Sequence, residues 1–231
     1  MSSARFSAAG FRAGLIGSGV LAPGIALYGA AVGVMAAAAG LSLFESAVFS
    51  GVVYAGGAQM ASLGAWADPL PLFLLMLTTL AMNSRYLLLG AALRPWLGHL
   101  PAYQTYPTLF VMGDTNWALA LREREAGRDD AAFLLGSGLV LWLVWLGSTV
   151  AGHAFGRLLG QPERFGVDFM LPAFFAAMAV ALFRGAASLV PLAVGAVTAV
   201  AVERLTGGPW HLLAGALVGS LAGPLLHRDA D

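Results

Sequence analysis

The sequence contains no cysteine and no lysine among its 231 residues, and only 10% of its residues are charged. Without cysteine the chain cannot form a disulfide, a thiolate metal site or a cysteine nucleophile. All 12 basic residues are arginine, the net charge is zero and there is no basic run, so nucleic acid is excluded as a partner. There is also no metal-ligand cluster and no phosphate-binding loop, so we expect neither a metal nor a cofactor.

Hydrophobic residues make up 59% of the chain, well above the roughly half of a soluble domain. Apolar segments lie at 13–38, 44–65, 70–93, 104–120, 131–156, 168–184, 187–203 and 209–226. A helix needs about 20 apolar residues to cross the hydrocarbon core. We therefore predict an all-α polytopic transmembrane bundle of about seven spans, or roughly five to eight depending on which interrupted segments are half-helices.

The stretch YAGGAQ, residues 54–59, interrupts one of these apolar segments. Gly56 and Gly57 each cost about 1 kcal/mol of helix stability relative to alanine, so the sequence predicts a broken or re-entrant helix here. Backbone groups freed by unwinding can bind a carboxylate or an ammonium, and Gln59 adds a donor and an acceptor. The alternative is that the glycines only permit close helix packing, with Gln59 in an interhelical hydrogen bond.

Two more polar groups interrupt apolar sequence. Asn83 and Arg85 lie in LAMNSRYLLLG, and Asp114 lies in MGDTNW. Arg85 could grip a carboxylate, or it could lie near a helix end and reach the lipid headgroups. Asp114 could pair with Arg85, bind an ammonium or carry a proton, and the alternative is an ordinary helix cap.

Glu45 and His153 are further candidates for proton coupling. Glu45 follows the turn in AAAAGLSLF, and we favour its interpretation as an acid in the first turn of a helix. His153 could titrate near neutrality, but a lone histidine in a membrane more often makes an interhelical hydrogen bond. Tryptophans 66, 96, 142, 145 and 210 include candidates for the interfacial aromatic belt.

The arginines predict the topology. Arg5, Arg12 and the arginine-bearing loop 122–131 indicate a cytoplasmic N-terminus and a cytoplasmic loop. Arg94 also favours the cytoplasm, which conflicts with the other arginines if segments 44–65 and 70–93 both cross fully. The conflict disappears if segment 44–65 enters the membrane and returns without crossing it.

The chain is predicted to be one transporter domain, 1–231, which could contain an internal repeat. Segment 15–33 aligned on 134–152 matches Leu, Gly, Ser, Gly, Leu and Gly at a constant offset. The corresponding half-repeats would be 11–120 and 131–226. Duplicated halves with the substrate site at their interface are common in secondary transporters.

The order and spacing of these motifs resemble the AzlC-type permease family, the large subunit of two-component branched-chain amino-acid exporters. The matching stretches are GVLAPGIALYGAAVG, SAVFSGVVYAGGAQMASL, LAMNSRYLLLGAALRPWL, the Gly113-Asp114 pair and LWLVWLGSTVAG. The chain departs from the family pattern at Tyr86, where a histidine is expected after the arginine, and at Thr115, where a glutamate is expected after the aspartate.

The resemblance implies a multi-pass secondary transporter of the bacterial inner membrane that exports branched-chain or similar apolar amino acids. It also implies a small multi-span partner subunit of the AzlD type. Because the sequence carries no cofactor or ATP-binding motif, we expect an ion gradient, of protons, to drive transport. Gly56, Gly57 and Gln59 would form the backbone-rich half of the substrate site. Asn83 and Arg85 would hold or gate the carboxylate, and Asp114 would hold the ammonium, carry the coupling proton, or both. The alternatives are an intramembrane enzyme and a non-transporting scaffold subunit.

Overall fold

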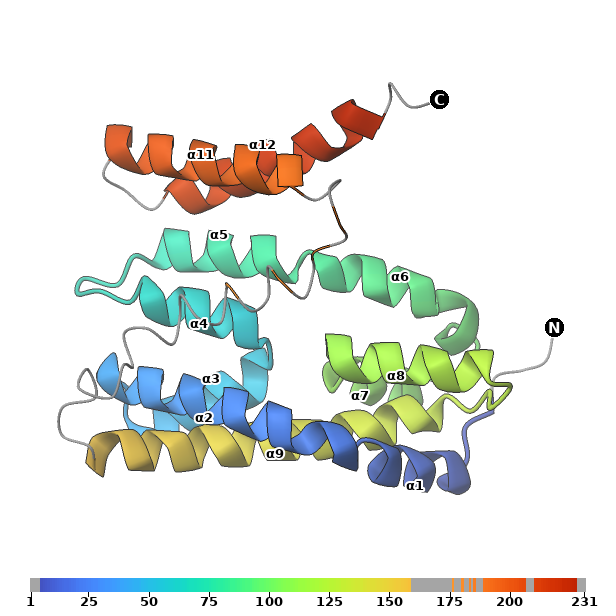
Figure 1. Cartoon of the computed structure of the whole chain (residues 1–231). Helices are drawn as coiled ribbons and strands as arrows, with labels where there is room; N and C mark the ends of the chain where they lie inside the picture. The colour runs from blue at the N-terminus through green and yellow to red at the C-terminus, as the bar shows by residue number, and fades with distance from the viewer. Residues whose placement is uncertain are drawn as a thin grey trace. The chain divides into compact units, whose positions relative to one another are not determined.

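The computed structural model describes residues 5–158, 189–206 and 210–227, together with Ala176, Val180, Phe183 and Gly185. Throughout this part of the chain the regular secondary structure is helical, apart from one isolated bridge between Arg5 and Asp130 (Figure 1). The described residues divide into two compact units, 5–63 with 82–158, and 64–81 with the segments beyond 175. Most of the predicted apolar segment 168–184 lies outside the described residues.

The helices follow one another in a simple order. They are α1 (Ala8–Gly17), the 3-10 turn η1 (Gly19–Leu21), α2 (Ala22–Ala38), α3 (Leu43–Val53), α4 (Gly56–Gly64), α5 (Leu72–Asn83), α6 (Arg85–Leu97), α7 (Ala102–Phe110), α8 (Asp114–Glu125), α9 (Ala132–Leu158), α11 (Leu189–Thr206) and α12 (Trp210–His227).

Within the described ranges, four helical stretches are long and apolar enough to span a membrane. They are Ala8–Ala38, Leu72–Leu97, Ala132–Leu158 and Leu189–Thr206, with shorter apolar helices at Leu43–Val53 and Ala214–Gly223. Large apolar side chains cover their outer surfaces, as at Val20 (88% exposed) and Leu87 (77% exposed). Such a surface suits lipid and not water. The predicted class, an all-α transmembrane bundle, is confirmed.

Segment 44–65 is broken, as predicted. Helix α3 ends at Val53, Tyr54 adopts the left-handed conformation (φ 40°, ψ 44°), and α4 starts at Gly56. In Figure 1, α4 then runs back in the direction opposite to α3. Because a bulky residue rarely adopts positive φ, Tyr54 marks this break as a strained and specific feature.

Segment 104–120 is a second broken segment, and its apolar composition alone does not reveal this. Helix α7 begins beside the end of α6, where the Thr105 hydroxyl donates to Leu97 O at 3.4 Å. It ends near the middle of α9, where the rings of Phe110 and Trp142 lie 6.3 Å apart. After residues 111–113, α8 returns toward the start of α9, so these two helices also enter and return.

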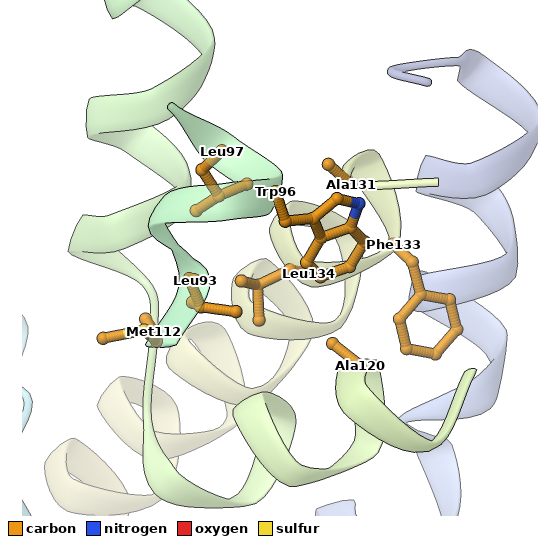
Figure 2. Close-up of a cluster of buried hydrophobic side chains, with 8 residues drawn as sticks. All are labelled: Leu93, Trp96, Leu97, Met112, Ala120, Ala131, Phe133 and Leu134. Carbon is orange, nitrogen blue, oxygen red and sulfur yellow. The ribbon is translucent and has the colours of Figure 1, made fainter. Parts of the chain in front are cut away.

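A hydrophobic cluster joins α6 and α8 to the start of α9 (Figure 2). The cluster contains Leu93, Trp96 and Leu97 of α6, Met112 just before α8, Ala120 of α8, and Ala131, Phe133 and Leu134 at the start of α9. Trp96 is only 2% exposed, so it belongs to this core and not to an interfacial belt.

The N-terminus and the loop 122–131 lie at the same end of this unit. Arg5 O accepts a hydrogen bond from Ala131 N at 2.8 Å. The Asp130 carboxylate accepts hydrogen bonds from the backbone and the hydroxyl of Ser7, which caps α1. The two arginine-bearing segments are therefore on one side, as the positive-inside rule requires of them. Their cytoplasmic placement stays a prediction.

Glycines let α1 and α2 lie directly against α9. A Cβ on Gly33 would fall 2.6 Å from His153 N and would also overlap the Thr149 carbonyl. Gly14 meets the Phe133 carbonyl in the same way, and Gly152 of α9 meets Ala30. Small residues at helix interfaces allow such close approach in membranes. The contacts of Gly33 with Thr149 and of Gly152 with Ala30 join the two segments of the suggested repeat. Whether the halves are duplicated stays a prediction, as does the single domain.

We expect Gly33→Ala to lower the thermal stability of the purified protein. The methyl group must push two helix backbones apart, and overpacking of this kind costs about 1–3 kcal/mol. The measurement is the melting temperature in detergent. The matched control is Gly24→Ala on the same helix, where a Cβ would meet nothing within 4 Å. Equal melting temperatures for the two variants would contradict the close packing of α2 on α9.

The second unit contains a helical hairpin of α11 and α12. Gly195 and Gly215 face each other across it, and a Cβ on Gly195 would lie 3.0 Å from Gly215 O. The rings of Phe73 and Trp210 lie 6.2 Å apart in the same unit.

Candidate substrate site

Both broken segments, 44–65 and 104–120, pack against helix α9 and break near its middle. It has 27 residues, and Trp145 is its middle residue. Helix α3 follows α9 from its end to this midpoint: Ser46 pairs with His153, Ser50 with Thr149, and the Tyr54 ring packs on Trp145. An α-helix of this length covers about 40 Å. The first break therefore lies halfway along a membrane-spanning helix.

At the first break, α4 presents the start of a helix to a buried environment. The described hydrogen bonds include none from the first-turn N–H groups of residues 56–58, while Gln59 N donates to Ala55 O at 2.8 Å. The Gln59 side chain is fully buried, and its Oε1 accepts from Trp145 Nε1 at 3.2 Å. Its Nε2 has no partner within the described part of the chain. A helix start with free donors is a ready anion site.

Three aromatic rings cover this helix start. Tyr28 of α2 packs edge-on against Trp145 with centroids 5.1 Å apart, and Tyr54 packs on it at 6.4 Å. A Cβ on Gly56 would lie 2.7 Å from both Trp145 and Tyr28. Only glycine therefore fits at position 56. At Gly57 a Cβ would meet only the flexible end of Met82, at 3.0 Å.

At the second break, Arg85 and Asp114 form an ion pair. Arg85 Nη2 and Asp114 Oδ2 are 2.9 Å apart, and the guanidinium also lies over the Tyr86 ring, 5.3 Å from its centroid. Arg85 is the first residue of α6 and Asp114 the first residue of α8. The prediction that Asp114 lies against a cation is confirmed.

The alternative interpretation of Asp114 as the helix cap is wrong by one residue. The N-cap is Gly113, with extended backbone at φ −123°, and its N–H is satisfied by the side chain of Asn116 at 2.7 Å. Asp114 therefore takes no part in capping α8. The Asp114 carboxylate is available to bind Arg85 or another cation. An acid in the first turn of α8 also interacts favourably with the helix dipole.

The two breaks lie next to each other. A Cβ on Gly113 would be 3.9 Å from the Tyr54 hydroxyl oxygen. Of the predicted site residues, Gly56 and Gln59 lie directly against the aromatic cluster, and the Arg85–Asp114 ion pair lies at the neighbouring break. Asn83, two residues before Arg85, has a buried Oδ1 with no partner in the described part of the chain.

Glu45 and His153 lie at the other end of α3. Glu45 is in the first turn, where its carboxylate accepts from Ser42 N at 2.7 Å and completes a capping box. His153 is 1% exposed, and its Nδ1 is 2.8 Å from the Ser46 hydroxyl, which is an interhelical hydrogen bond. Both arrangements match the structural interpretations given above. Their roles in proton coupling stay predictions.

The aromatic residues of the site were not identified from the sequence. Trp145 was a candidate for the interfacial belt, but it is 3% exposed and packs at the centre of the site. The available signal was the spacing of Trp145, Thr149 and His153, which places one polar-capable side chain per turn on a single face of α9.

We expect Gly56→Ala to reduce transport far more than it reduces the yield of inserted protein. The added methyl group would overlap two rings that close over the start of α4. Gly57→Ala is the matched control, because Met82 can move aside and a milder loss should follow. Transport by each variant, divided by its membrane yield, decides this prediction. Equal losses would show that the two glycines serve only helix packing.

These features define a class of protein: a helical membrane protein in which two broken segments meet at the middle of a long apolar helix, an arrangement typical of secondary transporters. The chain belongs to the AzlC family, whose description is AzlC protein and which it matches over residues 20–159. It is also 32% identical over 199 residues to the inner membrane protein YgaZ of Escherichia coli (strain K12), a match that covers 83% of this chain and 80% of that protein. No solved structure shows significant similarity. The AzlC family is a membrane transport family and not an enzyme family.

Proposed function

We propose that this chain is the large subunit of a secondary transporter that exports branched-chain or similar apolar amino acids across the bacterial inner membrane. The observation that supports this most is the meeting of two broken helices halfway along α9, with free helix-start donors on one side and the Arg85–Asp114 pair on the other. A zwitterion offers a carboxylate to the helix-start donors and Arg85, and an ammonium to Asp114.

In this proposal the substrate inserts between Arg85 and Asp114, which form an ion pair with each other in its absence. Its carboxylate takes the place of Asp114 on the Arg85 guanidinium and also accepts hydrogen bonds from the first-turn N–H groups of α4 and from Nε2 of Gln59. Its ammonium takes the place of Arg85 on Asp114. Because each protein charge exchanges one partner for another, neither is left unpaired in a low-dielectric site.

Asp114 is the proposed carrier of the coupling proton. It is the carboxylate at the junction of the breaks, whereas Glu45 is engaged in its capping box and His153 lies two turns of α9 away from Trp145. Protonating Asp114 would release both the Arg85 guanidinium and a bound ammonium. The return step would then be linked to the proton gradient. A cytoplasmic N-terminus and a small AzlD-type partner subunit belong to the same proposal.

Counterflow in proteoliposomes tests the function. Vesicles that contain the chain, with and without the small multi-span subunit, are loaded with one unlabelled amino acid and diluted into labelled leucine. Loading with leucine, isoleucine or valine should drive transient accumulation of label, and loading with lysine or glutamate should not. If no amino acid drives accumulation in either preparation, the chain is not the proposed exporter, and a scaffold role takes its place.

A further inference from the structure

We propose that Tyr28, Tyr54 and Trp145 recognise the side chain of the substrate, and that Tyr28 limits its size. The three residues come from α2, from the break between α3 and α4, and from the middle of α9. This inference rests on the proposed function, because it assigns the apolar wall of the same site.

The position of Gly56 carries the argument. Its N–H is one of the first-turn donors of α4, which bond to no backbone acceptor in the described part of the chain, so a carboxylate bound there lies against this residue. The atoms nearest to the side-chain direction of Gly56 belong to Trp145 and Tyr28, each 2.7 Å from where a Cβ would be. The side chain of an amino acid is attached to the carbon beside its carboxylate. Trp145 and Tyr28 are therefore the nearest side chains that a substrate held at this residue can contact, and their rings must move to admit it.

The chemistry of the wall favours apolar side chains. Trp145 has one polar hydrogen, and its Nε1 already donates to Gln59 at 3.2 Å. The faces and edges of the three rings offer apolar burial, and the phenol hydroxyls of Tyr28 and Tyr54 are the only other polar groups that these three side chains carry. A polar side chain would lose its water there without compensation, whereas an aliphatic one gains from leaving water.

Of the three aromatic residues, Tyr28 is the one whose substitution alters neither the hydrogen bond to Gln59 nor the turn at Tyr54. Trp145 positions Gln59, and Tyr54 holds the left-handed turn that ends α3. Tyr28 instead projects from the continuous helix α2, and its ring packs edge-on against Trp145 at 5.1 Å. Shortening it enlarges the apolar wall without changing a residue of either break.

The test compares phenylalanine with leucine as counterflow substrates in wild-type, Tyr28→Leu and Tyr28→Trp proteins. Tyr28→Leu should raise the phenylalanine-to-leucine ratio of specificity constants about tenfold or more, and Tyr28→Trp should lower it and favour alanine. Phe44→Ala is the matched control, because this aromatic residue of α3 is 75% exposed and far along the helix from the break. Its ratio should equal that of the wild type.

The outcomes separate this inference from the function on which it rests. If wild-type protein exchanges leucine but both Tyr28 variants keep the wild-type ratio, the wall is elsewhere and the inference is wrong, while the transport function stands. The same holds if Phe44→Ala shifts the ratio as much as Tyr28→Leu does. If wild-type protein exchanges no amino acid at all, the proposed function itself fails. A change of total rate without a change of ratio also counts against the inference, since it reports packing and not recognition.

Discussion

Replacing Arg85 by lysine should leave insertion into the membrane unchanged and should lower the apparent affinity for leucine, or its exchange rate, about ten- to a hundredfold. The guanidinium contacts the Asp114 carboxylate at 2.9 Å and lies over the Tyr86 ring. Its planar fork can form two parallel bonds to a carboxylate and stack on an aromatic face, and a lysine ammonium reproduces neither.

The lysine variant separates a ligand-binding arginine from one that only reaches the lipid headgroups. Arg94→Lys is the matched control, because Arg94 lies in the last turn of the same helix and an ammonium there keeps the favourable charge near the helix end. The measurement is labelled-leucine counterflow at several concentrations, beside membrane yield. Near-normal transport by Arg85→Lys would remove Arg85 from the site and leave Gly56, Gly57 and Gln59 as its candidates.

Replacing Asp114 by asparagine should abolish the pH dependence of exchange and reduce its rate at least about tenfold. Asparagine keeps the size of the side chain but carries neither a proton nor a charge. It also leaves the Arg85 guanidinium without its ion-pair partner. Capping of α8 should survive, because Gly113 and Asn116 provide it.

The control for Asp114→Asn is Glu125→Gln at the other end of α8, where an exposed acid is neutralised in the same way. Rates of leucine exchange are measured from about one pH unit below neutrality to one above it. A variant that retained full exchange with an unchanged pH profile would rule out Asp114 as the proton carrier. His153 and Glu45 would then be the groups to test.

The first break could be predicted because its cause is local. The break falls at Tyr54 and Ala55, directly before Gly56 and Gly57, which begin α4. Two glycines weaken a continuous helix through this point, because each costs about 1 kcal/mol of helix stability relative to alanine. The ion pair of Arg85 and Asp114 was also predicted as one option, since two opposite charges in apolar sequence have few other partners. Both predictions depend on residue chemistry that does not change with the fold.

The second break and the aromatic cluster could not be predicted in the same way. Residues 111–113 contain a single glycine, and the chain turns there because α7 and α8 both pack on α9. Tyr28 and Trp145 are more than a hundred residues apart, so their contact depends on how α2 lies against α9. A tryptophan in an apolar segment has the same local signature in an interfacial belt and in a buried site.

The return of segment 44–65 agrees with the distribution of arginines in the sequence. Arg5, Arg94 and the loop 122–131 all favour the cytoplasm, and they conflict if segments 44–65 and 70–93 both cross fully. The return of α4 after Tyr54 avoids this conflict (Figure 1). The same entering and returning path is taken by α7 and α8. Each broken pair follows a long apolar helical stretch, Ala8–Ala38 in one case and Leu72–Leu97 in the other.

The most direct test of a single substrate site between the two breaks uses the absence of cysteine from the natural chain. Gly113→Cys introduces the only thiol at their junction, where a Cβ fits, 3.6 Å from Asn116 Oδ1 and 3.9 Å from Tyr54. The rate of its alkylation by a small maleimide is measured with and without leucine, with Ala126→Cys, at the exposed end of α8, as the control. At a leucine concentration about ten times Kd, alkylation of Gly113→Cys should slow about tenfold, and that of Ala126→Cys should not change. Equal rates at position 113 with and without leucine, in protein that exchanges leucine, would place the substrate elsewhere.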